Sequence, residues 1–137
     1  MTAPLILLAE DDTNDVYFFQ RAVKKLAIPN PVHIARDGKE AVAYLNGEGE
    51  FADREKYPLP GLIVLDLNMP RQNGFEILKW LRQTPPLDQL PAVILTSSQA
   101  QRDIQQALEL GAKQYYVKPS TPSKLPELLK VMMTYCR

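Results

Sequence analysis

The sequence has one cysteine, no excess of charge and no long hydrophobic run. Cys136 has no partner within the chain for a disulfide bond, which indicates a reducing compartment such as the cytoplasm. The 16 basic residues balance the 16 acidic ones, so the chain lacks the basic excess with which proteins bind nucleic acids or anionic membranes. No apolar run approaches the roughly 18 residues of a membrane span, and residues 1–4 lack the basic start of a signal peptide. We therefore expect a cytoplasmic protein without nucleic-acid or membrane partners.

The length and composition are those of one globular domain. With 137 residues, 45% of them hydrophobic and 23% charged, the chain can bury a core without disulfide bonds or structural metal. We expect a single domain over residues 1–137, with no separate output domain. Residues 46–61 are rich in glycine and proline and form the one long irregular connection, which we interpret as an exposed excursion within this domain.

Short apolar runs alternate with amphipathic stretches of helical length. A helix is expected after each predicted strand, the first over 15–26 and the last over about 122–135. This rhythm predicts an α/β fold, a parallel sheet with helices on both faces and right-handed crossovers. An eight-stranded barrel needs roughly 250 residues, so the flavodoxin-like (βα)5 doubly wound sheet with strand order 2-1-3-4-5 is the expected architecture. The predicted strands are 5–9, 32–35, 62–65, 92–95 and 115–117.

Polar residues follow four of the predicted strands. Glu10 and Asp11 come after the first strand, Asp66 after the third, Thr96 after the fourth and Lys118 after the fifth. With strand order 2-1-3-4-5 these side chains converge at one edge of the sheet, where open parallel sheets bind ligands. Three carboxylates repel one another unless a cation lies among them, and a small set of oxygen ligands suits Mg²⁺.

The same pocket has the groups that phosphoryl transfer needs. Thr96 offers a hydroxyl donor and Lys118 a positive charge, both of which match the oxygens of a phosphoryl group in transfer. Asp66 can act as the nucleophile, because aspartate forms acyl phosphates. Taken singly, an acidic cluster can cap a helix and a Lys-Pro pair can make a turn; taken together, the groups predict a Mg²⁺-dependent phosphoryl-transfer site.

These motifs resemble response-regulator receiver domains, in order and with the family's spacing, over nearly the whole chain. The matching segments are Leu8-Ala9-Glu10-Asp11-Asp12, residues 35–41, Asp66-Leu67-Asn68-Met69-Pro70 with Gly74, Thr96-Ser97, Gly111-Ala112 and residues 115–119.

The resemblance implies a role for each residue of the pocket. Asp66 would be the phosphoacceptor, and Mg²⁺ would be held by Glu10, Asp11, Asp66 and the backbone carbonyl of Asn68. It also implies a signalling protein that is no enzyme in the ordinary sense, since its catalysis is limited to its own phosphorylation and dephosphorylation.

Further implications concern the switch. Thr96 and Lys118 would contact the phosphoryl oxygens, and the Lys118–Pro119 bond would be cis, as in this family. Tyr115 falls at the family's switch aromatic, which is expected to turn inward when Thr96 moves toward the phosphoryl group.

The resemblance also implies partners. A sensor histidine kinase would supply the phosphoryl group. Independently of the resemblance, Tyr115 and Tyr116 of the fifth strand, with apolar residues of the last helix, suit a homodimer through the fourth helix, fifth strand and fifth helix. The 46–61 insert and the Lys118–Pro122 ending are similar to those of stand-alone regulators of cyanobacterial phytochrome kinases, so a phytochrome is the expected partner. Ser97 and Ser120 depart from the family's usual Ala and Phe, and Ser120 should alter the packing beneath the fifth strand.

Three other functions are weaker alternatives. A metal-dependent phosphatase with an aspartyl nucleophile places a second Asp two residues on as general acid, whereas this chain has Asn68, which cannot do that work. A receiver that only docks and never switches is disfavoured, because every polar residue of the site is present. A nucleotide-binding loop is disfavoured, because Gly47-Glu48-Gly49 neither follows a strand nor precedes a helix signal.

Overall fold

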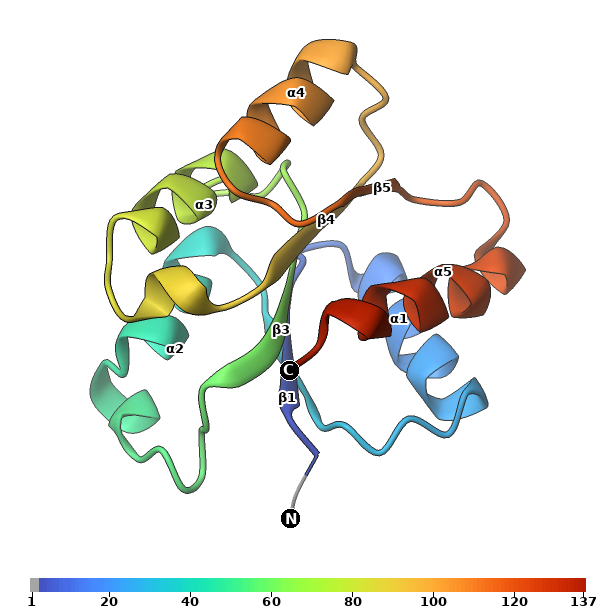
Figure 1. The fold of residues 1–137 in the computed structure, drawn as a ribbon. Coiled ribbons are helices and arrows are strands. Elements are labelled where there is room, and N and C mark those ends of the chain that lie inside the picture. The colour runs from blue at the N-terminus through green and yellow to red at the C-terminus, as the bar shows by residue number, and fades with distance from the viewer. Residues whose placement is uncertain (1–2) are drawn as a thin grey trace.

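The computed structural model describes residues 3–137 as a five-stranded parallel sheet between two layers of helices (Figure 1). The strand order is β2-β1-β3-β4-β5, which confirms the expected doubly wound fold. The strands are β1 (Leu5–Ala9), β2 (Val32–Ala35), β3 (Pro60–Leu65), β4 (Ala92–Thr96) and β5 (Tyr115–Val117). The helices are α1 (Thr13–Lys25), α2 (Gly38–Asn46), α3 (Gly74–Arg82), α4 (Gln101–Glu109) and α5 (Leu125–Met132).

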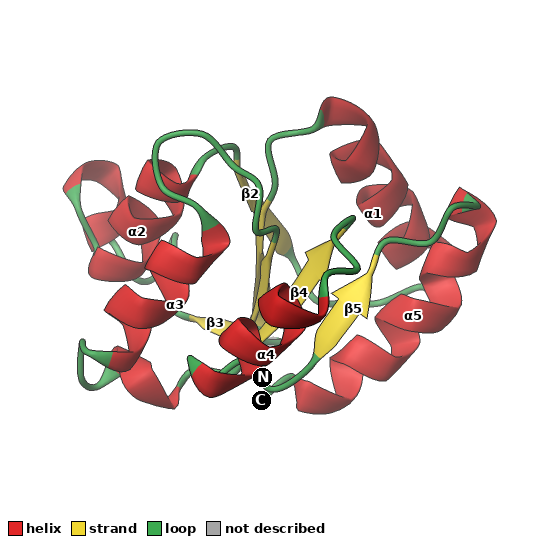
Figure 2. Cartoon of the chain, turned by 90° about the horizontal axis from the view of Figure 1, so that it is seen from above, coloured by secondary structure: helices red, strands yellow, loops and turns green. Residues whose placement is uncertain are grey.

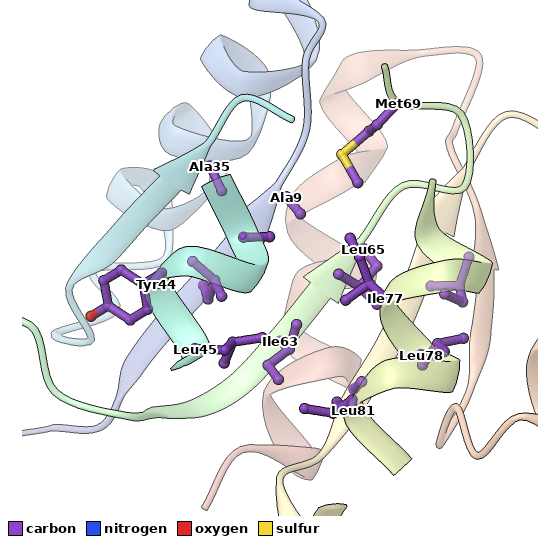
Figure 3. Packing of buried hydrophobic residues seen from close by; sticks show 14 of the residues in the cluster. Ala9, Ala35, Tyr44, Leu45, Ile63, Leu65, Met69, Ile77, Leu78 and Leu81 are labelled. Carbon is purple, nitrogen blue, oxygen red and sulfur yellow. The ribbon is translucent and has the colours of Figure 1, made fainter. Parts of the chain in front are cut away.

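Two apolar layers form the core, one on each face of the sheet. Helices α1 and α5 cover one face, and α2, α3 and α4 cover the other (Figure 2). Strands β1, β3 and β4 are buried along their whole length, so alternate residues serve opposite layers. Leu65 and Ile63 of β3, for example, face Ile77 and Leu81 of α3 on the second face (Figure 3).

Helix capping fixes where the chain turns at the carboxyl edge of the sheet. The Asp12 side chain accepts a hydrogen bond of 3.0 Å from the backbone N–H of Asp15, so α1 begins at Thr13, two residues before the predicted start. Asn73 and Glu76 form a reciprocal capping box at the start of α3. The structure divides the predicted last helix, 122–135, into three parts: α5 in the middle and a 3₁₀ turn on each side, over 122–124 and 133–135. Pro126 lies in the first turn of α5, where proline is tolerated.

The 46–61 connection is partly buried, which corrects the expectation of a merely exposed excursion. A 3₁₀ turn over Gly49–Ala52 places Phe51 in the core, 9% exposed, with its ring 5.1 Å from those of Tyr44 and Tyr57. The Arg54 guanidinium donates to the carbonyl oxygens of Tyr44 and Leu45 at 2.9 and 2.8 Å, which ties the connection to the end of α2.

Two expectations from the sequence concern a membrane-spanning helix and a signal peptide. No helix within residues 3–137 is both long and apolar enough to cross a membrane. Met1 and Thr2, part of the stretch in which we expect no signal peptide, lie outside the described residues.

Candidate functional site

The residues predicted from the strand ends meet at the carboxyl edge of the sheet. The register pairs Ala9 with Leu65 and Thr96 with Val117, so the residues that follow these strands leave the sheet at similar heights. Glu10, Asp66 and Thr96 are the buried polar residues of the described chain, exposed by 2%, 4% and 0%. Burying a polar group costs free energy unless the group forms hydrogen bonds, so buried polar groups are bonded to one another or to a ligand.

Three of the carboxylates form a cluster that can hold a cation. One oxygen each from Glu10, Asp11 and Asp66 lies within 4.8 Å of the others, with Glu10 and Asp66 buried and Asp11 exposed. Burial, reinforced by the charge of Asp66, raises the pKa of Glu10 to about 7. An all-oxygen donor set of this size and charge fits a divalent cation such as Mg²⁺ or Mn²⁺.

Both oxygens of Asp66 are held by hydrogen bonds. Oδ1 accepts from the Thr96 hydroxyl at 2.7 Å and from the backbone N–H of Asn68 at 3.1 Å, and Oδ2 accepts from the Lys118 ammonium at 2.8 Å. Gly74 permits this arrangement, because a Cβ there would lie 2.6 Å from the backbone oxygen of Asp66. The carboxylate is therefore fixed in orientation at the base of the pocket.

Lys118 reaches the pocket from β5 and is bound by three carboxylates. Its ammonium lies 2.8 Å from Glu10 Oε1, 2.8 Å from Asp66 Oδ2 and 2.7 Å from Asp15 Oδ2. Burial alone would lower the pKa of Lys118, but the hydrogen bonds to Asp15, Asp66 and Glu10 outweigh it and hold that pKa above its ordinary value. The lysine is thus a permanent cation in the site.

The expectation of a cis peptide bond between Lys118 and Pro119 is wrong. Within residues 3–137 the cis peptide bond is at Pro85–Pro86, and Lys118–Pro119 is trans. The lysine is directed instead by its three carboxylate partners and by its backbone N–H, which donates to the Thr96 carbonyl at 2.8 Å.

Asp15 is the contact of this site that the sequence interpretation missed. Residue 15 was expected only as the start of the first helix, yet Asp15 lies in the first turn of α1 and binds a lysine 103 positions away. The available signal was its spacing: Asp15 is one helical turn beyond the Asp11-Asp12 pair and so projects over the same edge of the sheet.

Tyr115 is connected to the site through the loop after β4. Its hydroxyl donates to the backbone carbonyl of Ser98 at 2.9 Å, and Ser98 lies two residues beyond Thr96. The Ser98 hydroxyl in turn donates to Asp103 of α4 at 2.6 Å. A displacement of Thr96 would therefore reach both β5 and α4 through this loop.

Several aromatic side chains outside the site pack against other parts of the fold. His33 stacks on Tyr44 with ring centroids 4.6 Å apart. Phe19 is 1% exposed in the core and the adjacent Phe18 is half-buried, while Trp80 packs against the layer of α2, α3 and α4.

The fold and the site together define a doubly wound α/β protein with a carboxylate cluster, at the carboxyl edge of its sheet, that can hold a cation. The sequence model of the response regulator receiver domain matches residues 6–130, and the chain belongs to that family.

Known relatives agree with this assignment. Response regulator Rcp1 of Synechocystis sp. is 39% identical over 114 residues, which are 83% of this chain and 76% of Rcp1. The crystal structure of the phosphorylated cyanobacterial phytochrome response regulator RcpA superposes with a TM-score of 0.90 at 34% identity, over 98% of this chain and 94% of RcpA. The Mn²⁺-bound form of Rcp1 superposes with a TM-score of 0.85 at 34% identity, over 96% of this chain and 92% of that one.

Proposed function

We propose that this protein is a response regulator that accepts a phosphoryl group on Asp66 in a Mg²⁺-dependent reaction. The observation that carries the proposal is the environment of this one carboxylate. Asp66 is buried, bonded on one oxygen to Thr96 and on the other to Lys118, and it shares a cation-binding cluster with Glu10 and Asp11. These are the groups that position and neutralise a phosphoryl group during transfer.

The chemistry follows from this geometry. An oxygen of Asp66 attacks the phosphorus of a phosphohistidine, and the phosphorus–nitrogen bond breaks. The electron pair of that bond stays with the imidazole, which takes up a proton from water. Thr96 and Lys118 then transfer their hydrogen bonds from the carboxylate to the phosphoryl oxygens. Mg²⁺, held by Glu10, Asp11, Asp66 and the carbonyl of Asn68, would supply positive charge against those oxygens.

The proposed phosphodonor is a sensor histidine kinase of the phytochrome class. The proposed location of the reaction is the cytoplasm. The support is the likeness to RcpA, a phytochrome response regulator, along nearly the whole of both chains. The acyl phosphate should persist, because Asn68 stands where an aspartyl phosphatase would need a second acid.

The proposed output is a contact with a partner protein or a homodimer through α4, β5 and α5. Thr96 would be drawn toward the phosphoryl group and Tyr115 would follow through the Ser98 loop. Leu108 of α4 and Val131 of α5 are 43% and 51% exposed, so two of these elements present apolar surface. Sedimentation of phosphorylated and unphosphorylated protein tests this output, and Val131→Asp should weaken a dimer formed there.

Intact-mass measurement tests the phosphorylation itself. Wild type and Asp66→Asn are incubated with Mg²⁺ and acetyl phosphate. We expect one added phosphoryl group on the wild type alone, abolished by a chelator. No adduct with continuous release of phosphate would indicate a phosphatase, and no adduct without release would indicate a docking module; either result refutes the proposal.

A further inference from the structure

The Lys118 ammonium has all of its donors engaged. A lysine ammonium has three N–H groups, and this one meets three acceptors, Glu10, Asp15 and Asp66, at 2.7–2.8 Å. Glu10 and Asp66 lie at the ends of strands, whereas Asp15 approaches from the first turn of α1. Its side chain is 37% exposed, against 3% for Glu10 and 6% for Asp66.

The three acceptors differ in whether they keep their hydrogen bond to Lys118 during phosphoryl transfer. Glu10 and Asp66 belong to the cation-binding cluster, and Asp66 also receives the phosphoryl group. Their oxygens are therefore drawn to other partners during the reaction. Asp15 lies outside that cluster, so its bond to Lys118 is the one that the reaction leaves in place.

The Lys118 side chain borders open space on one side. A cavity of about 200 Å³ opens beside it, lined by the polar residues Glu10, Asp15, Lys118 and Ser120 and by apolar residues of β1, α1, β4 and the segment from Pro119 to Leu125. Ser120 is too short to fill this space. The backbone of Lys118 is fixed by its bond to Thr96, but its long side chain has room to move.

We infer that Asp15 is a positioning residue for phosphoryl transfer, which holds the Lys118 ammonium beside Asp66 while the other two carboxylates exchange partners. The inference rests on the proposed function. With Asp15 in place, one N–H of Lys118 stays directed at α1 and another is presented to the phosphoryl group. Without it, the ammonium can turn into the cavity and its distance from the reacting oxygens is no longer set.

The test separates the position of Lys118 from metal binding and from helix stability. Asp15→Asn removes the charge and Asp15→Glu keeps it. Glu40→Gln is the matched control, because Glu40 is also a first-turn acid with a side chain 37% exposed, but it lies on α2 away from Lys118. For each variant, the rate of phosphorylation by acetyl phosphate at saturating Mg²⁺ is followed by intact mass, and Mg²⁺ affinity is measured separately by calorimetry.

We expect Asp15→Asn to slow phosphorylation by between about tenfold and the roughly 100-fold that a misplacement of about 1 Å can cost. Its Mg²⁺ affinity should stay at the wild-type value, Asp15→Glu should recover most of the rate, and Glu40→Gln should react like wild type. Any of three results would overturn this inference while leaving the proposed function in place. Asp15→Asn could react at or above the wild-type rate, its Mg²⁺ affinity could fall by the same factor as its rate, or Asp15→Glu could fail to recover the rate. Wild type that takes no phosphoryl group refutes the proposed function, and the inference with it.

Discussion

The hydrogen bond between Thr96 and Asp66 should contribute measurably to stability as well as to phosphorylation. Thr96→Val replaces the hydroxyl with a methyl group of similar size, so the change deletes one donor without opening a large cavity. Asp66 Oδ1 would keep only the backbone N–H of Asn68, at 3.1 Å. Thr96 is 0% exposed, so water cannot take the place of the lost hydroxyl.

The magnitude follows from the charge on the acceptor. Hydrogen bonds to charged groups contribute about 1.5–3 kcal/mol, so we expect Thr96→Val to lower the free energy of unfolding by about 2 kcal/mol. For a domain of this size the corresponding fall in melting temperature is about 6–10 °C. The assay is urea and thermal unfolding followed by circular dichroism, with chelator present so that bound metal does not add to stability.

A double-mutant cycle with Asp66→Ala isolates the bond from other effects of the substitution. The coupling energy between the two positions should be about 2 kcal/mol, because each change alone removes the same interaction. A coupling below about 0.5 kcal/mol, the usual error of additivity, would show that the hydroxyl and the carboxylate do not interact as the structure has them.

Three further outcomes are expected. The Arg82 guanidinium donates to the backbone carbonyls of Asp88 and Gly111, which would lose a charged donor in Arg82→Met. We expect this substitution to lower the free energy of unfolding by about 3 kcal/mol in urea titrations. A change under about 1 kcal/mol would contradict that role. Burial lowers the pKa of His33 below its ordinary 6.5, so the unfolded chain binds more protons and stability should fall as pH drops through and below 6.5. His33→Gln should lose less stability than wild type over this range, and an equal loss would assign the pH dependence elsewhere. Saturating Mg²⁺ should raise the melting temperature of wild type but not of Asp11→Asn, measured by calorimetry; an equal rise in both would place the cation away from the carboxylate cluster.

The sheet and the strand-end residues could be predicted because both depend on local pattern. β1 is an uninterrupted aliphatic run, and the structure gives the strand the predicted bounds Leu5–Ala9. Asp66 and Thr96 follow strands that are neighbours in the predicted order, so the fold rule alone brings their side chains together.

The features that could not be predicted depend on single side chains and distant contacts. Phe51 lies among Gly, Glu and Asp residues without any periodicity, so nothing in the pattern indicates that it enters the core. The pairing of Asp15 with Lys118 joins two elements on opposite ends of the chain through the direction of two side chains, which helical spacing leaves open. The trans Lys118–Pro119 bond departs from the expectation that the family resemblance supplied.

The central claim is that Asp66 is the residue that carries the phosphoryl group, and reductive trapping tests it most directly. Borohydride reduces an aspartyl phosphate to homoserine, so peptide mass spectrometry of the phosphorylated protein identifies the modified position. We predict homoserine at position 66 in wild type treated with Mg²⁺ and acetyl phosphate, and none when Mg²⁺ is removed. Homoserine at another aspartate, or a phosphoryl group that survives borohydride on a different side chain, would contradict this account of the site.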